Sequence, residues 1–295
     1  MSEFQPRRTD RVRSQLQHVY PKRLLSALMF KATRVRFAPF KNWQIRWFIR
    51  KYQVDMNQAL EGNPLAYPEF NTFFTRPLRA GARPINDDPR CISSPADGTI
   101  LEHGDITDRT LLQVKGLELD VAELLGHDAE LTQTFANGRF ATVYLSPRDY
   151  HRVHMPVDGT LTRMAYVPGE LFSVSLPCVY SIPRLLARNE RVVSIFDTKL
   201  GPVAVILVGA VFVGCIETIW AGPVIGNTRK AVTWWDYREP DAGIHLQRGQ
   251  EMGRFNMGST VITLFANRDI EWAKDIRPGL PIDMGQDLAE YSKSD

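Results

Sequence analysis

Central to the sequence is the stretch Arg254-Phe-Asn-Met-Gly-Ser-Thr-Val-Ile-Thr-Leu-Phe265, which joins a glycine-containing turn to an apolar run. From Ser259 onward, β-branched and large apolar residues predict a buried strand. Gly258 leaves the carbonyl before Ser259 without a flanking side chain that would hinder attack. A lone Gly-Ser pair is most often a glycine bulge before a strand. The alternative is a serine that attacks its own preceding carbonyl, and the surrounding sequence favours it.

The composition is that of an ordinary globular protein. Of the 295 residues, 44% are hydrophobic and 23% are charged, which suits one large domain or two smaller ones. The cysteines Cys91, Cys178 and Cys215 are far apart and follow no metal-ligand spacing. Such a sparse, odd set favours a reducing compartment without disulfides.

Charge is divided unevenly along the chain. Residues 1–50 hold twelve basic and two acidic side chains, a balance of +10, whereas the remaining residues carry −7. A basic leader on an acidic body indicates a polyanionic partner, either anionic lipid or nucleic acid. Residues 1–23 lack the apolar core of a signal peptide. The longest apolar run, Val203 to Ile216, is too short for a membrane-spanning helix, and its valines and glycines favour two buried strands instead.

The leader shows two amphipathic helical patterns. The first follows Pro21 and places Leu24, Leu25, Leu28 and Met29 on one face. The second is predicted to start after Asn42 and has an apolar face flanked by two tryptophans, with arginines opposite; its residues are Trp43, Ile45, Arg46, Trp47, Phe48, Ile49, Arg50 and Tyr52. Tryptophan and arginine on such a helix are typical of a segment in the lipid interface. The alternative is a pair of helices packed on the protein's own core, and nucleic acid is the weaker polyanion.

Residues 55–60 and 118–130 are predicted to form short helices, and β-rich runs dominate from about residue 91. Predicted strands include 140–145, 192–196, 203–208 and 211–218, while 222–245 is predicted to be a loop-rich insert. The hexapeptide Pro95-Ala-Asp-Gly-Thr-Ile100 is echoed by Pro156-Val-Asp-Gly-Thr-Leu161. Each is a tight turn that leads into a strand, which suggests either duplicated β-modules or two independent turns.

The candidate chemistry lies in three separate segments. His151 and His154 are three residues apart, but no third ligand completes a metal site. Asp97, His154 and Ser259 offer a nucleophile, a base and a carboxylate that orients the base. Ser259 lacks the Gly-x-Ser-x-Gly elbow of α/β-hydrolases. A serine at the mouth of a strand therefore suits attack on its own backbone better than attack on an ester.

Several long motifs resemble the phosphatidylserine decarboxylases, which are membrane-associated pyruvoyl enzymes. The resemblance covers roughly residues 20–285 and is weakest over 222–245. It rests on Phe70-Asn-Thr-Phe-Phe-Thr-Arg-Pro-Leu-Arg79, Arg83-Pro84-Ile85, Pro95-Ala-Asp-Gly98, Tyr144-Leu-Ser-Pro-Arg-Asp-Tyr-His-Arg-Val-His-Met-Pro156, Tyr166-Val-Pro-Gly-Glu-Leu-Phe-Ser-Val174, Leu186-Ala-Arg-Asn-Glu-Arg-Val192, Phe196-Asp197-Thr198, Gly214-Cys-Ile-Glu-Thr-Ile-Trp-Ala-Gly222 and Gly249-Gln-Glu-Met-Gly-Arg-Phe-Asn-Met-Gly-Ser-Thr-Val261. Met257 replaces the leucine usual in bacterial members, a nearly volume-conserving change that leaves Gly258-Ser259 intact.

The resemblance implies a proenzyme that cuts itself at Gly258-Ser259 into chains 1–258 and 259–295. His154, oriented by Asp97, would take the Ser259 proton, and Ser259 would become a covalent pyruvoyl group. That group would form a Schiff base with phosphatidylserine and act as the electron sink while carbon dioxide leaves. His151 is expected to handle a proton for the substrate. Tyr144 and Ser173 are expected to line the substrate pocket, and no metal is expected.

These observations predict an α+β protein. A helical membrane-docking segment, residues 1–80, would precede a mainly antiparallel β-rich catalytic domain, residues 81–295. The expected product is phosphatidylethanolamine. The expected location is peripheral, on the cytoplasmic face of a bacterial inner membrane, with the two cleaved chains held together and further dimerised. Alternatives are an uncleaved lipid-binding relative without activity and a soluble pyruvoyl-dependent amino-acid decarboxylase, which the basic, tryptophan-containing leader disfavours.

Overall fold

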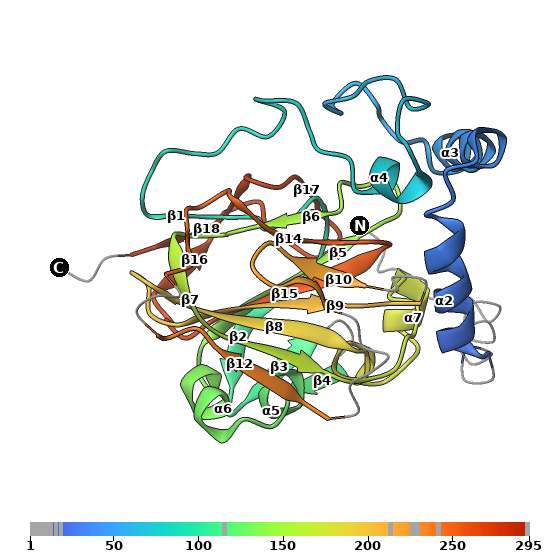
Figure 1. Ribbon diagram of the computed structural model, residues 1–295. Coiled ribbons are helices and arrows are strands. Elements are labelled where there is room, and N and C mark those ends of the chain that lie inside the picture. Colours follow the sequence, from blue (N-terminus) through green and yellow to red (C-terminus); the bar gives the residue numbers. More distant parts are fainter. Residues whose placement is uncertain are drawn as a thin grey trace.

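The computed structural model describes residues 20–113, 117–211, 215–224, 231–239 and 243–292, together with residues 14 and 17. Figure 1 shows a body of strands with two longer helices along one side. The helices are α2 (Lys22–Ala32), α3 (Ala38–Tyr52), α4 (Phe70–Phe74), α5 (Val121–Leu124), α6 (Ala129–Phe135), α7 (Leu176–Val179) and α8 (Leu185–Arg188). The strands are β1 (Cys91–Ser93), β2 (Gly98–Thr107), β3 (Thr110–Gln113), β4 (Leu117–Asp120), β5 (Arg139–Leu145), β6 (Arg152–His154), β7 (Gly159–Val167), β8 (Arg191–Thr198), β9 (Val203–Val208), β10 (Ile216–Thr218), β11 (Gly222–Val224), β12 (Thr233–Asp236), β13 (His245–Leu246), β14 (Glu251–Phe255), β15 (Ser259–Phe265), β16 (Ile270–Trp272), β17 (Pro281–Ile282) and β18 (Asp287–Tyr291).

The largest sheet has strand order β12-β7-β8-β9-β15-β5-β2-β3-β4, and β13 and β17 join it at β7 and β2. Its paired strands run antiparallel, as they do in the two smaller sheets β11-β10-β14-β6 and β1-β18-β16. The α+β prediction with an antiparallel body is therefore confirmed. The strand β15 lies in the interior of the largest sheet, between β5 and β9.

The sequence pattern explains why β15 and β9 are central. Every residue of Ser259–Phe265 and of Val203–Val208 is buried. Continuous runs of apolar β-branched residues suit strands that are covered on both faces. The two predicted turns at Asp97-Gly98 and Asp158-Gly159 both lead into strands of this sheet, β2 and β7. Gly98 is required there, because a Cβ would lie 2.2 Å from the Tyr144 carbonyl oxygen on β5.

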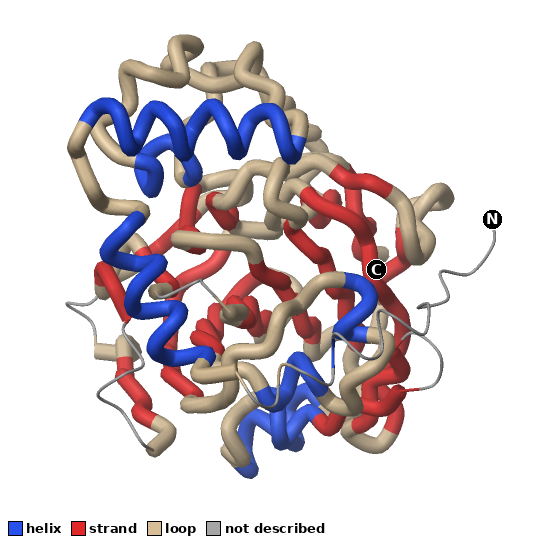
Figure 2. The backbone as a smooth tube through the Cα atoms, turned by 90° about the vertical axis from the view of Figure 1, so that its right-hand side faces the viewer, coloured by secondary structure: helices blue, strands red, loops and turns tan. Residues whose placement is uncertain are grey.

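Helices α2 and α3 form the side of the molecule seen at the right of Figure 1 and at the left and top of Figure 2. On α3, Ile45 and Phe48 face inward and share a small core with the three buried phenylalanines of α4. The opposite side is exposed, with Trp43 and Trp47 showing 58% and 43% of their surface. Helix α3 thus has one face packed on protein, as the second interpretation of this segment predicted, and one exposed face, while docking on lipid stays a prediction.

Several local predictions were wrong. Residues 55–60 form turns rather than a helix, because the Asp55 side chain accepts from Asn57 N–H and Ala59 pairs with Leu78. Over 118–130, part of the predicted helix is strand β4, and the helices are two short ones capped by Asp120 and Asp128. Helix α3 begins at Ala38, with a proline in its first turn, instead of after Asn42; proline suits that position.

Two further corrections concern the later strands. The strand predicted over 211–218 is shorter, β10 at Ile216–Thr218, and residues 212–214 lie outside the described residues. The predicted loop-rich insert contributes strands, because β12 and β13 both pair with β7. Residues 225–230 and 240–242 of that insert also lie outside the described part. No helix among the described residues is long and apolar enough to cross a bilayer.

Candidate active site

Gly258 and Ser259 lie where the chain enters β15. Ser259 is opposite Leu145, the last residue of β5. Its side chain is fully buried, and its Oγ has no hydrogen-bond partner among the described residues. A Cβ placed on Gly258 would meet nothing closer than the Leu145 carbonyl oxygen at 3.7 Å. Gly258 therefore presents no side chain beside its carbonyl, and the Ser259 hydroxyl next to it has no partner among the described residues.

His151 is the histidine that faces this peptide bond. Residues 146–149 form a tight turn after β5, in which Ser146 N–H donates to the Asp149 carboxylate (2.7 Å). His151 Nδ1 is 2.8 Å from the Asp149 carbonyl oxygen, and a carbonyl only accepts, so Nδ1 carries the proton. Nε2 is left as an acceptor without a partner among the described residues, 3.9 Å from a Cβ built on Gly258.

Burial keeps His151 neutral. Its side chain has no exposed surface, and desolvation, assisted by the nearby Arg76 charge, lowers its pKa to about 3. The hydrogen bond to Asp149 opposes this shift without cancelling it. A neutral imidazole with a free lone pair can accept a proton at residue 259 or a hydrogen bond from a substrate there.

Helix α4 and the residue after it contact His151, Arg152 and the segment before Gly258. The Phe74 ring lies against the His151 ring, with 4.0 Å between their centres. Arg152 Nε donates to the Thr75 carbonyl oxygen at 2.9 Å. Asn71 Nδ2 donates to Asn256 Oδ1, also at 2.9 Å, two residues before Gly258. The sequence matched the motif at residues 70–79 but indicated no role for these side chains, because their partners lie far away in the chain.

His154 lies on β6 and points to different partners. Its Nδ1 is 2.8 Å from the Gly249 carbonyl oxygen, which fixes the proton on Nδ1, and its Nε2 accepts from the Tyr150 hydroxyl at 2.9 Å. Burial lowers the His154 pKa, and the Gly249 contact partly offsets this. Both ring nitrogens of His154 are therefore engaged, whereas His151 Nε2 has no partner among the described residues.

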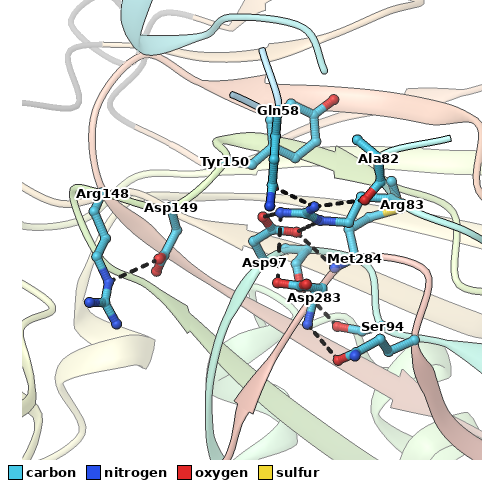
Figure 3. Close-up of polar contacts among 12 residues, drawn as sticks. Gln58, Ala82, Arg83, Ser94, Asp97, Arg148, Asp149, Tyr150, Asp283 and Met284 are labelled. Atoms are coloured by element: carbon cyan, nitrogen blue, oxygen red, sulfur yellow. Dashed lines mark hydrogen bonds and ion pairs between the residues drawn. The ribbon is translucent and has the colours of Figure 1, made fainter. Parts of the chain in front are cut away.

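Asp97 is held by Arg83 (Figure 3). Arg83 Nε and Nη2 donate to the two carboxylate oxygens at 2.9 and 2.5 Å, and Met284 N–H donates to Oδ1 at 2.8 Å. The Pro95 carbonyl oxygen accepts from His154 N–H at 2.8 Å, so the turn of Asp97 adjoins His154 through the backbone. The predicted series Asp97, His154, Ser259 is not a hydrogen-bonded chain in this structure. Arg83 was present in a matched motif, but its pairing with Asp97 was not evident from the sequence.

A cavity of about 460 Å³ reaches Gly258. The predicted pocket residues Tyr144 and Ser173 both line it, together with Gly258 and Met257. Burial raises the pKa of Tyr144 to about 12, so its hydroxyl stays protonated. The remaining wall is mostly apolar and comes from the leader and α3 as well as the β body; it includes Tyr20, Lys22, Leu25, Phe48, Tyr52, Phe74 and Val174. A cavity of this size and character suits one end of an amphiphilic molecule.

The described residues contain no group of three histidine, cysteine or acidic side chains that would hold a metal ion. The residues around Ser259 instead fit a covalent prosthetic group that is made from the chain itself. The unpaired Ser259 Oγ and the free His151 Nε2 lie beside the Gly258-Ser259 peptide bond, and Gly258 has no side chain to cover it. These residues fit the conversion of Ser259 into a covalent carbonyl group.

Comparison with known proteins agrees with this geometry. The family model described as phosphatidylserine decarboxylase matches residues 70–290, and a second one, described as PSD, matches residues 12–53. The chain belongs to the phosphatidylserine decarboxylase family. The phosphatidylserine decarboxylase proenzyme of Photobacterium profundum is 49% identical over 289 residues, which is 97% of this chain and 99% of the relative.

Two further relatives carry the same name. The protein of Aliivibrio salmonicida is 49% identical over 286 residues, covering 97% of this chain and 100% of the relative. A protein of Pseudomonas fluorescens is 49% identical over 274 residues, covering 93% and 96%. The chain is thus a decarboxylase of a bacterial phospholipid-metabolism family, and its relatives are named as proenzymes. The family match extends across α4, β15 and the cavity wall between them.

Proposed function

We propose that the chain is a self-maturing phosphatidylserine decarboxylase that produces phosphatidylethanolamine at a membrane surface. The observation that carries the proposal is the position of Gly258-Ser259. Gly258 lines a mostly apolar cavity, the neighbouring Ser259 hydroxyl is unpaired among the described residues, and the free Nε2 of His151 is nearby. The family membership indicates the class of reaction. The position of Gly258-Ser259 indicates where the proposed maturation occurs.

Maturation is proposed to begin when Ser259 Oγ attacks the Gly258 carbonyl carbon and passes its proton to a histidine. An ester bond then replaces the peptide bond. β-Elimination breaks the ester, leaves residues 1–258 with a carboxylate terminus and leaves a dehydroalanine at position 259. Its imine tautomer takes up water and loses ammonia, which yields the pyruvoyl group. These steps need no external oxidant or reductant.

In the second reaction, the pyruvoyl carbonyl supplies the electron sink for decarboxylation. The chain's own residues bind and orient the lipid. The apolar wall formed by Phe48, Phe74 and Met257 accepts the aliphatic part of the lipid near its head group, and its dryness favours loss of a charged carboxylate. His151 Nε2 is placed to exchange a proton at the carbon that loses carbon dioxide.

The exposed apolar residues are proposed to dock the protein on an anionic membrane. Of the large hydrophobic side chains described as exposed, all except Leu60 and Ile219 lie between Tyr20 and Trp47. This surface adjoins the cavity that reaches Gly258, because Tyr20, Lys22 and Leu25 line it. Docking would let the head group enter the cavity while the acyl chains remain in lipid. We place the protein peripherally on the cytoplasmic face of the inner membrane.

The first test is the mass of the purified protein. After incubation at neutral pH, mass spectrometry is expected to find two pieces, residues 1–258 and residues 259–295, the second beginning with a pyruvoyl group instead of an amine. Edman sequencing of the second piece should fail for the same reason. A chain that stays whole would contradict the proposal and would favour an uncleaved lipid-binding relative without activity.

The second test concerns the docking surface. The double variant Trp43→Ser/Trp47→Ser is expected to bind anionic vesicles about tenfold or more weakly, because each indole that enters the interface contributes on the order of 1 kcal/mol. Co-sedimentation with phosphatidylglycerol-containing vesicles measures this change. These substitutions are preferable to deletion of the leader, because Phe48 on the same helix belongs to the core beside His151.

Ile219→Ser provides the matched control, because Ile219 is as exposed as the two tryptophans but lies in the turn between β10 and β11. It should bind vesicles like the unmodified protein. Equal vesicle binding by all three proteins would show that α3 does not dock. The vesicle and mass measurements together also separate the proposed enzyme from a soluble pyruvoyl-dependent amino-acid decarboxylase, which would cleave itself but ignore vesicles.

A further inference from the structure

A second cavity, of about 510 Å³, lies beside the catalytic one. Tyr20 and Lys22 form part of the wall of both cavities, whereas Gly258 lines only the catalytic cavity. The wall of the second cavity is cationic, with Lys22 and Arg23 at the start of α2 and Arg188 at the end of α8. The reaction proposed above uses none of the groups on this wall except Tyr20 and Lys22.

The cations surround one aromatic ring. Lys22 Nζ lies 3.6 Å from the centre of the Phe172 ring, and Arg188 Cζ lies 4.8 Å from it. Glu170 is the acidic side chain on the wall, and it forms an ion pair with Lys22 at 2.9 Å. Three positive charges therefore face one negative charge. The surplus charge attracts an anion, and the buried Phe172 ring strengthens the electrostatic field at the cations by excluding water.

The wall that carries these cations is rigidly built. Asn189, which is fully buried, accepts from Phe172 N–H at 2.9 Å and donates to the Phe172 carbonyl oxygen at 2.8 Å. Gly169 packs so closely on the next segment that a Cβ would lie 2.4 Å from the Arg188 carbonyl oxygen. Glu170 N–H donates to that same oxygen at 2.8 Å. The spacing between Phe172 and Arg188 is thus fixed by the backbone.

Apolar side chains continue from the edge of the cavity. Leu24 lines it and is 59% exposed, and Leu28, one turn further along α2, is 57% exposed. A ligand that paired with the cations and packed on the leucines would have an anionic group attached to an aliphatic chain. Among molecules that meet a membrane-docked protein, an anionic phospholipid has this structure.

We propose that this second cavity binds the phosphate head group of an anionic phospholipid that does not itself react. Arg23 and Arg188 contact the phosphate, and Leu24 and Leu28 lie along the acyl chains. The bound lipid holds the start of α2, and with it Lys22 and Tyr20, at the entrance to the catalytic cavity. The inference rests on the proposed membrane docking, and it predicts that a non-substrate lipid increases decarboxylation.

Binding can be measured without activity. Dihexanoyl phosphatidylglycerol, kept below its micelle concentration, is titrated calorimetrically into the unmodified protein and into Arg23→Gln/Arg188→Gln. The double variant is expected to bind about tenfold or more weakly, since hydrogen bonds to two charged groups are lost. The matched control is Arg268→Gln/Lys274→Gln, which removes the same charge from exposed positions on either side of β16, outside the leader and α3. It should keep its affinity for the soluble lipid within about twofold.

The rate of decarboxylation distinguishes a separate lipid site from part of the substrate site. Phosphatidylserine is held at a fixed mole fraction in phosphatidylcholine vesicles while phosphatidylglycerol replaces part of the phosphatidylcholine. The rate of carbon dioxide release should rise and saturate for the unmodified protein and for the control, and should stay flat for Arg23→Gln/Arg188→Gln. Competitive inhibition by phosphatidylglycerol would show that the cavity belongs to the substrate, and equal losses in both double variants would show diffuse attraction only. Either result overturns the inference, whereas lipid binding without any carbon dioxide release would refute only the proposed function.

Discussion

Ser259→Ala is expected to remain a single chain and to release no measurable carbon dioxide from phosphatidylserine. Alanine removes the oxygen that attacks the Gly258 carbonyl, so neither the ester nor the later carbonyl group can form. The change should fold well, because Ser259 Oγ is buried and makes no hydrogen bond with the described residues. Denaturing gel electrophoresis and carbon dioxide release measure the two outcomes.

Ser194→Ala is the matched control for this experiment. Ser194 lies on β8 of the same sheet, is equally buried, and also has a hydroxyl without a partner among the described residues. Its replacement should leave cleavage and activity unchanged. If Ser259→Ala still split at position 258, or if Ser194→Ala failed to split, the role assigned to Ser259 would be wrong.

The largest expected difference between two variants concerns the histidines. We expect His154→Ala to stay uncleaved and inactive, and His151→Ala to cleave but decarboxylate about 10²–10⁴-fold more slowly, the range for a lost general acid or base. Basicity supports His154 as the base in cleavage, because full burial takes the pKa of His151 down to about 3. Proximity supports His151 at the substrate, because its free Nε2 lies near Gly258, next to residue 259, where the pyruvoyl carbonyl would form.

The experiment is a gel on both purified variants, followed by an assay of the cleaved material. His154 must release Tyr150 to reach Ser259, since its Nε2 accepts from that hydroxyl. An uncleaved His151→Ala together with a cleaved His154→Ala would reverse the assignment and make proximity the deciding factor. A His151→Ala protein that cleaves and turns over at the normal rate would remove His151 from the reaction.

The sequence predicted those parts of the fold that depend on continuous apolar runs. Strands β9 and β15 were predicted correctly because their short runs are apolar and rich in β-branched residues. Such short runs favour buried strands over helices. The turns over residues 55–60 were missed because local side-chain hydrogen bonds outweighed a weak helical tendency. The candidate site shows the same limit. Ser259 and both histidines were identified from motifs, but the contacts of Phe74 with His151 and of Arg83 with Asp97 exist only once distant segments meet.

The interior position of β15 has a consequence for the matured protein. After the proposed cleavage, the piece 259–295 would still supply β15 between β5 and β9, and also β17 beside β2 and β18 beside β1. The two pieces therefore share one hydrophobic core and cannot separate while either remains folded. Unfolding becomes a dissociation, and refolding becomes a second-order reaction between two fragments, so the midpoint of denaturation depends on protein concentration. The precursor, as one chain, has no such dependence. Cleavage of one peptide bond would thus preserve the native contacts but make refolding depend on the association of two fragments.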